Sequence, residues 1–151
     1  MLYIAFQKSD NSCIDKLITF FTKSQYVHCE LVTAKNKNSI YGYSSYIKEG
    51  VRAKWINIDD NWEVIPLNKT QFKDIKAQDI KDFYTKTEGR KYDYLGCLGF
   101  VLGNPDNPSR YFCSEWCAEA LGLENPSKIS PAKLHEIIEN SEDIEWVLET
   151  S

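Results

Sequence analysis

The chain has 151 residues, of which 42% are hydrophobic and 26% are charged, proportions typical of a single globular domain covering residues 1–151. Its 18 basic and 22 acidic side chains give a net charge of −4, which argues against nucleic acid or an anionic membrane as partner. Its five cysteines are an odd number and include no CxxC pair, which predicts free thiols in a reducing compartment rather than a secreted disulfide framework.

The first half of the chain is predicted to consist mainly of strands. Residues 2–7 form a short apolar run typical of a buried strand. A helix is expected over residues 14–21, where apolar side chains recur at helical spacing. Further strands are predicted, with a hairpin turn at 35–38, over residues 26–32, 39–44, 51–56 and 62–67.

The second half is predicted to be mainly helical. The apolar spacing indicates one helix over residues 72–83, stopped near Gly89, and a core helix over residues 94–102. After a loop at 103–108, we expect a short helix from Cys113 to Gly122 and another that begins at Ser130-Pro131, with Ser as N-cap. Alternation of apolar residues at 144, 146 and 148 predicts a final strand. Antiparallel strands with segregated helices make the expected fold class α+β.

No membrane segment or secretion signal is expected. The longest apolar stretch of the C-terminal half, residues 94–102, is far shorter than the roughly 20 residues needed to cross a bilayer. The first residues have no basic stretch, and their apolar run is too short for a signal peptide. We therefore expect a cytoplasmic protein.

Only two histidines are available as a general base. His28 lies in a predicted strand, where alternation places Tyr26, His28 and Glu30 on one face, with backbones about 7 Å apart between His28 and Glu30. The tips of these two side chains could meet; the alternative is a solvent-facing edge on which both are merely polar. His135, beside charged residues on a helix, is predicted to be solvated and without a role.

Cys113 lies where a polar loop passes into a helix. A thiol in the first helical turn lies at the positive end of the helix dipole, which lowers its pKa. Backbone N–H groups of that turn can also stabilise an oxyanion beside the sulfur. The alternative is a buried structural cysteine, which is also the interpretation for the other four: Cys13, Cys29, Cys97 and Cys117.

Other chemistries have less support in the sequence. A zinc site could draw on Cys29, Cys113, Cys117 and His28, but no pair of them has the spacing of common zinc motifs. No phosphate-binding glycine loop occurs, and no pair of carboxylates stands out for glycoside or metal chemistry. We therefore predict no metal and no cofactor.

Several short motifs in order along the chain resemble the circularly permuted, YiiX-like NlpC/P60 (papain-like) cysteine hydrolases. The first two are Phe6-Gln7-Lys8-Ser9-Asp10 and the strand Tyr26-Val27-His28-Cys29-Glu30-Leu31-Val32. The others are Gly50-Val51-Arg52, Tyr92-Asp93-Tyr94-Leu95-Gly96, Phe112-Cys113-Ser114-Glu115 and Ser130-Pro131-Ala132-Lys133-Leu134. Each motif is loose, but together they span nearly the whole chain. The resemblance implies a papain-like antiparallel sheet packed against helices, with the histidine before the cysteine.

The resemblance also implies roles for individual residues. Cys113 would be the nucleophile and His28 its general base. Many members of this group carry a third, histidine-orienting acid on the following strand, but residues 39–45 contain no acid. Glu30 is the nearest candidate for that role. Alternatively, Glu30 faces the substrate and Ser44 steadies the imidazole.

The function expected from these residues is hydrolysis of an amide or ester through a Cys113 acyl-enzyme. The resemblance implies a peptide, a cell-wall peptide or a lipid-like small molecule as substrate, and it does not choose among them. Tyr26, Tyr43, Tyr46 and Tyr111 could line an aromatic cleft for it, or belong to a tyrosine-rich surface. The alternative functions are a catalytically silent ligand-binding module on the same fold and a structural role in a larger assembly. The oligomeric state stays open.

Overall fold

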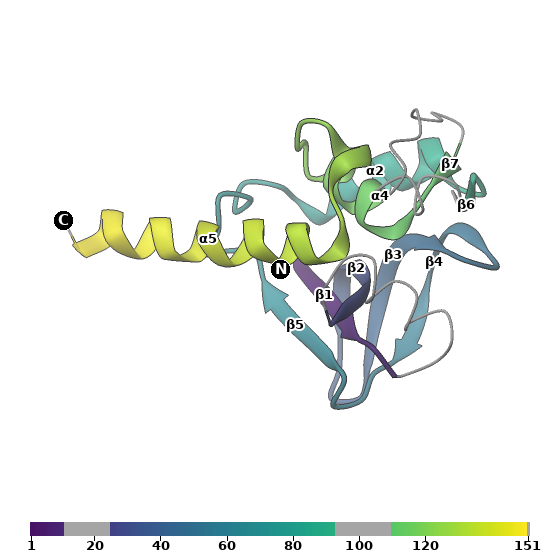
Figure 1. Ribbon diagram of the computed structural model, residues 1–151, viewed down its shortest axis with the longest axis horizontal. Coiled ribbons are helices and arrows are strands. Elements are labelled where there is room, and N and C mark those ends of the chain that lie inside the picture. The colour runs from purple at the N-terminus through teal and green to yellow at the C-terminus, as the bar shows by residue number, and fades with distance from the viewer. Residues whose placement is uncertain (11–24, 93–109, 151) are drawn as a thin grey trace.

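The protein is built around one five-stranded antiparallel sheet (Figure 1). The structure, a computed structural model, describes residues 1–10, 25–92 and 110–150. The strands lie in the spatial order β4-β3-β2-β1-β5. Their bounds are β1 Tyr3–Lys8, β2 Tyr26–Lys35, β3 Ser39–Tyr46, β4 Gly50–Asn57 and β5 Trp62–Pro66.

Three α-helices pack against this sheet (Figure 1). They are α2 (Ala77–Thr87), α4 (Cys113–Ala120) and α5 (Pro131–Thr150), with a short 3-10 helix, η1 (Pro126–Lys128), between the last two. β6 (Lys91–Tyr92) and β7 (Arg110–Tyr111) form a two-residue parallel pair, and β7 lies directly before α4 in the chain. The predicted α+β class, an antiparallel sheet packed against helices, is confirmed.

The helices cover one face of the sheet, and the main core lies between. Ile4 and Phe6 of β1 and Leu31 of β2 meet Trp116 of α4 and Leu134 of α5 there. A smaller cluster, centred on Ala5, Val32 and Ile40, lies apart from this main core. Because side chains alternate along a strand, residues next to one another in β1 and β2 divide between the two clusters.

The five strands predicted in the first half of the chain are all present, within a few residues of their expected ends. The helix expected from residue 72 begins later, at Ala77. Its first predicted turn is replaced by hydrogen-bonded turns in which the Thr70 hydroxyl donates to the Leu67 carbonyl and accepts from the Phe72 N–H. The helix then begins where the Asp79 carboxylate accepts a hydrogen bond from the Lys76 N–H at 2.8 Å.

The C-terminal helix begins as predicted and continues further. The Ser130 hydroxyl accepts a hydrogen bond from the Lys133 N–H at 3.1 Å, and Pro131 is the first helical residue. The final strand predicted at residues 144–148 is wrong, because α5 continues to Thr150. No Gly or Pro follows Pro131 to end the helix. Positions 134, 138, 141, 144 and 148 keep helical spacing, and all of them except Ser141 are apolar.

The helices predicted at 14–21 and 94–102 and the loop at 103–108 lie outside the described residues, as do Cys13 and Cys97. Within the described part of the chain, no helix combines the length and the apolar character needed to cross a membrane.

Candidate active site

A β-bulge in strand β2 sets the direction of its polar side chains. Gln7 of β1 pairs with His28 and Lys8 pairs with Tyr26, so Val27 is an extra residue in the ladder. The bulge separates Tyr26 from His28, although both were predicted to share one face. The Tyr26 ring packs against the main core, whereas His28 and Glu30 point toward each other.

The His28 imidazole and the Glu30 carboxylate are in direct contact. Nε2 of His28 lies 2.5 Å from Oε1 of Glu30, and Glu30 is completely buried. Glu30 has room there only because residue 42 is a glycine: a Cβ atom at Gly42 would lie 2.7 Å from Oε2 of Glu30. The predicted meeting of the two side-chain tips is therefore present, and the buried carboxylate does not face solvent.

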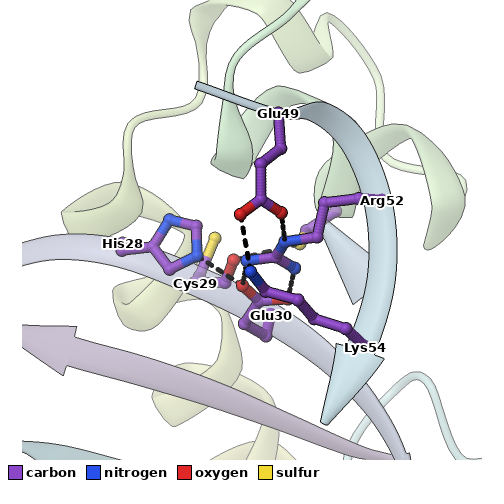
Figure 2. Close-up of polar contacts among 7 residues, drawn as sticks. His28, Cys29, Glu30, Glu49, Arg52 and Lys54 are labelled. Carbon is purple, nitrogen blue, oxygen red and sulfur yellow. Dashed lines mark hydrogen bonds and ion pairs between the residues drawn. The ribbon is translucent and has the colours of Figure 1, made fainter. Parts of the chain in front are cut away.

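Arg52 of β4 holds the other side of the same carboxylate. Its Nη1 donates to Oε2 of Glu30 at 2.7 Å and its Nη2 donates to Oε1 at 2.5 Å, a bidentate pair (Figure 2). Figure 2 shows the Glu30 carboxylate between the imidazole and the guanidinium, with Glu49 beyond Arg52. Glu49 forms a longer ion pair with Arg52 Nε at 3.4 Å. Two cationic neighbours thus surround one buried carboxylate.

Cys113 is the first residue of α4 and is held in place by the residues around it. Two residues earlier, the Tyr111 carbonyl accepts a hydrogen bond from the buried Ser45 hydroxyl at 2.6 Å. One turn later, Trp116 is fully buried and its indole N–H donates to the Thr87 hydroxyl at 2.8 Å. The helix N-terminus is thereby fixed against β3 and α2. Cys113 as a whole is 3% exposed.

The electrostatics of the site favour charge separation between Cys113 and His28. Burial acts to lower the pKa of His28, but the Glu30 carboxylate, a hydrogen bond with Cys113 and a hydrogen bond with Glu30 outweigh it and raise the pKa to about 10. A hydrogen bond from Cys29, and then interaction with His28, hold the pKa of the Cys113 thiol well below its usual range against the effect of burial. At neutral pH, the raised pKa of His28 and the lowered pKa of Cys113 favour a thiolate beside an imidazolium.

Glu30 remains ionised for a related reason. Burial alone would raise its pKa, but the charge on His28 and the hydrogen bonds from His28 and Arg52 lower it. Because Nε2 of His28 is occupied by Glu30, Nδ1 is the ring nitrogen left for the thiol. The chain Arg52–Glu30–His28–Cys113 thus alternates positive and negative charge. No sequence pattern predicted a role for Arg52. It lies opposite Ser44 in the β3–β4 register, within hydrogen-bond distance of Glu30.

The remaining cysteines described here lie beside this site. Burial and hydrogen bonds with Cys113 and Cys117 raise the pKa of the Cys29 thiol, so it stays protonated and can donate to the Cys113 sulfur. Cys117 is fully buried, and its sulfur lies 3.9 Å from the Cys29 carbonyl oxygen. All three thiols are free.

Of the four tyrosines predicted to line a substrate cleft, three contribute to the core and one lies beside His28. Tyr43 and Tyr111 are buried in the main core, and the Tyr26 ring stacks on His135, so their placement gives no support to an aromatic cleft formed by these three. Tyr46, the fourth, is 41% exposed and lies edge-on to the His28 ring at 5.4 Å. Trp62, which sequence analysis did not consider, approaches His28 at 6.1 Å. No sequence pattern identified Trp62, because it comes from a strand distant in the chain.

The second histidine is not on the surface. His135 was predicted to be solvated, but it is 6% exposed, because Tyr26 stacks on its ring and Phe6 packs edge-on against it. The bulge at Val27 places Tyr26 there, and helical periodicity alone could not show it.

No protein-family model matches this chain, and a search of curated proteins found no match. The resemblance to permuted NlpC/P60 hydrolases therefore rests on the quoted motifs.

Proposed function

We propose that this protein is a thiol hydrolase that cleaves an amide or ester bond through an acyl-enzyme on Cys113. The observation that carries the proposal is the buried series Arg52–Glu30–His28 beside a thiol at the first residue of a helix. A nucleophile, a base and a group that orients the base are the minimum for this chemistry.

In the acylation step, His28 holds the proton that Cys113 has given up. The thiolate attacks the substrate carbonyl carbon, and the first-turn N–H groups of α4 lie where they can stabilise the resulting oxyanion. The imidazolium then passes its proton to the departing amine or alcohol, which leaves a thioester on Cys113.

In the deacylation step, the neutral imidazole accepts a proton from water. The hydroxide attacks the thioester, the carboxylic acid product departs, and the proton returns to the Cys113–His28 pair. Glu30 keeps the ring orientation through both steps, and Arg52 keeps Glu30 ionised. Glu30 is thus the orienting acid in this proposal, in place of an acid on the following strand.

The proposed substrates are a peptide, a cell-wall peptide or a lipid amide or ester. Tyr46 and Trp62 are the aromatic rings nearest to His28 and would contact the part of the substrate next to the reacting carbonyl. A cytoplasmic location is part of the proposal, because a reducing environment keeps such a thiol free.

The second candidate function is a catalytically silent ligand-binding module on the same fold. Two observations favour it: the Cys113 thiol is almost inaccessible, and a pocket of about 280 Å³ lies elsewhere, at the β3–β4 turn. That pocket is lined by residues that include Glu49, Gly50 and Tyr92, but neither Cys113 nor His28.

The deciding experiment is the rate of Cys113 alkylation by iodoacetamide from pH 4 to 9. Mass spectrometry of the digested protein follows Cys113 separately from the other four cysteines. We expect a rate that stays high well below pH 7 in the natural sequence, because the thiolate persists there. In His28→Ala the low-pH rate should fall by at least about tenfold, toward that of an ordinary thiol with a pKa near 8.5.

His135→Ala is the matched control, because it removes the other buried histidine and leaves the Cys113 site intact. A Cys113 rate that follows an ordinary thiol and ignores His28 would contradict the hydrolase proposal. If the thiol is activated, ester and amide probes that leave an acyl group on Cys113 then separate a turning-over enzyme from a silent module.

A further inference from the structure

A second group of ligating side chains joins strand β5 to helix α5, away from the Cys113 site. It consists of Glu63 of β5 and of His135 and Glu139 of α5, one turn apart and therefore on the same helix face. One ligand atom from each of the three lies within 4.8 Å of the other two. We call these three residues the β5–α5 cluster.

Each ring nitrogen of His135 lies near a carboxylate oxygen, but a neutral imidazole can donate a hydrogen bond to only one of them. Nε2 lies 3.0 Å from Oε2 of Glu63, and Nδ1 lies 3.6 Å from Oε2 of Glu139. A neutral imidazole has one N–H and one lone pair. Whichever tautomer forms, one nitrogen lone pair therefore faces a carboxylate oxygen, and a cation between them would satisfy both.

The imidazole is held rigidly while one carboxylate is free to adjust. The Tyr26 ring stacks on His135 with centroids 4.1 Å apart, and Phe6 packs against its edge. The Tyr26 hydroxyl donates to Oε2 of Glu63 at 3.1 Å, the kind of outer contact that orients a ligating carboxylate. The Glu139 side chain is 58% exposed and can rotate.

The β5–α5 cluster carries two carboxylates, whose negative charge favours binding of a cation. Two carboxylates face one histidine, and the ion pairs found for Glu63 and Glu139 within the described ranges are both with that histidine.

We propose that the β5–α5 cluster binds a divalent transition-metal ion of the zinc type. Zinc accepts both imidazole nitrogen and carboxylate oxygen as ligands, and water can complete the tetrahedron. In a tetrahedral site, metal–ligand bonds of about 2.0–2.2 Å place the ligand atoms roughly 3.3–3.6 Å apart, so the exposed Glu139 side chain would have to move inward. The ion would connect α5 to the edge strand β5 and stabilise their packing.

Cobalt(II) titration of the full chain, followed by absorption, tests this proposal. Cobalt reports its ligands, since thiolate ligands add a charge-transfer band that imidazole and carboxylate ligands do not. We expect one cobalt ion per chain with visible d–d bands and no thiolate band, and the same binding in Cys113→Ser. Glu139→Gln should weaken binding by at least roughly tenfold.

Glu136→Gln is the matched control. Glu136 lies on the same helix, its side chain is also 58% exposed, and the substitution removes the same charge without touching the cluster. Binding in Glu136→Gln should equal that of the natural sequence, and zinc should raise the Tm of both proteins more than that of Glu139→Gln.

Three results would overturn the proposal. Equal affinity of Glu139→Gln and Glu136→Gln would show that Glu139 is not a ligand. A thiolate band that disappears in Cys113→Ser would assign the metal to the cysteines. Absence of saturable binding would leave the β5–α5 cluster as a group of direct side-chain contacts without a metal. Each of these outcomes is independent of the hydrolase proposal, which concerns Cys113 and His28.

Discussion

The protein contains two buried histidines, each in contact with a glutamate, and their surroundings differ. His28 touches Glu30, which is completely buried and also holds Arg52 in a bidentate pair. His135 touches Glu63 and Glu139, whose side chains are 40% and 58% exposed. The Glu30 carboxylate contacts two basic side chains, His28 and Arg52. Among the described residues, the ion pairs of Glu63 and Glu139 are with His135 alone.

This difference shows how one residue pair can serve two purposes. A buried carboxylate with two cationic neighbours stays ionised and fixed in position, which suits a group that orients a base. Carboxylates at a solvated edge retain water and freedom, which suits exchangeable ligands. Burial and the additional cation, rather than the His–Glu contact itself, separate the two sites.

Among these predictions, removing Glu30 should have the largest effect on the free energy of unfolding. Glu30→Ala removes the buried carboxylate that pairs with both Arg52 and His28, and we expect a loss of about 3–5 kcal/mol in the free energy of unfolding. Urea denaturation measures it. Glu49→Ala, which removes the more exposed partner of Arg52, should cost less than about 1 kcal/mol. Similar losses in the two variants would mean that burial does not distinguish the carboxylates.

Filling the space beside Glu30 should have a smaller effect. In Gly42→Ala the added methyl group meets Oε2 of Glu30 at 2.7 Å and displaces it from Arg52 or His28. We expect a loss of about 1–3 kcal/mol, typical of overpacking, with slower low-pH alkylation of Cys113.

Ser44→Ala, two residues along the same strand, is the control for that substitution. The Ser44 hydroxyl is buried, and no hydrogen-bond partner is found for it among the described residues, so its removal should be nearly neutral. A large fall in Cys113 reactivity in Ser44→Ala would return the imidazole-steadying role to Ser44 and contradict the assignment to Glu30.

The pH dependence of stability should give the most gradual effect. Folding raises the pKa of His28 from 6.5 to about 10, so its contribution is fully present below pH 6.5 and is lost as pH rises through 10. Folding lowers the pKa of Glu30 from 4.5, so its contribution is present above pH 4.5 and is lost at lower pH. The stability difference between the natural sequence and His28→Gln should therefore shrink from pH 6 toward pH 10 in urea titrations. A difference that is constant with pH would contradict the charged state of His28.

Local patterns predicted much of this molecule. Alternation identified the strands, and the order of helix signals identified α4 and the start of α5, because these signals depend on neighbouring residues alone. The approach of His28 to Glu30 followed from strand geometry as well.

The remaining features depend on contacts between distant residues. Arg52 reaches Glu30 across β3, and only the strand register brings the two together. The burial of His135 depends on Tyr26, which a single bulge turns toward α5. The alternation over residues 144–148 predicts a strand, but the helical spacing that precedes it continues unbroken through these residues, and α5 continues with it.

The bulge at Val27 also bears on how distant relatives of this chain can be recognised. A chain lacking that residue would pair regularly with β1 and still direct the tyrosine and the histidine to the same two sides. Deleting that one residue before the histidine would therefore move neither site, whereas the His-x-Glu spacing after it is fixed by the contact between His28 and Glu30. A search profile for this lineage should tolerate a one-residue gap before the histidine and none after it.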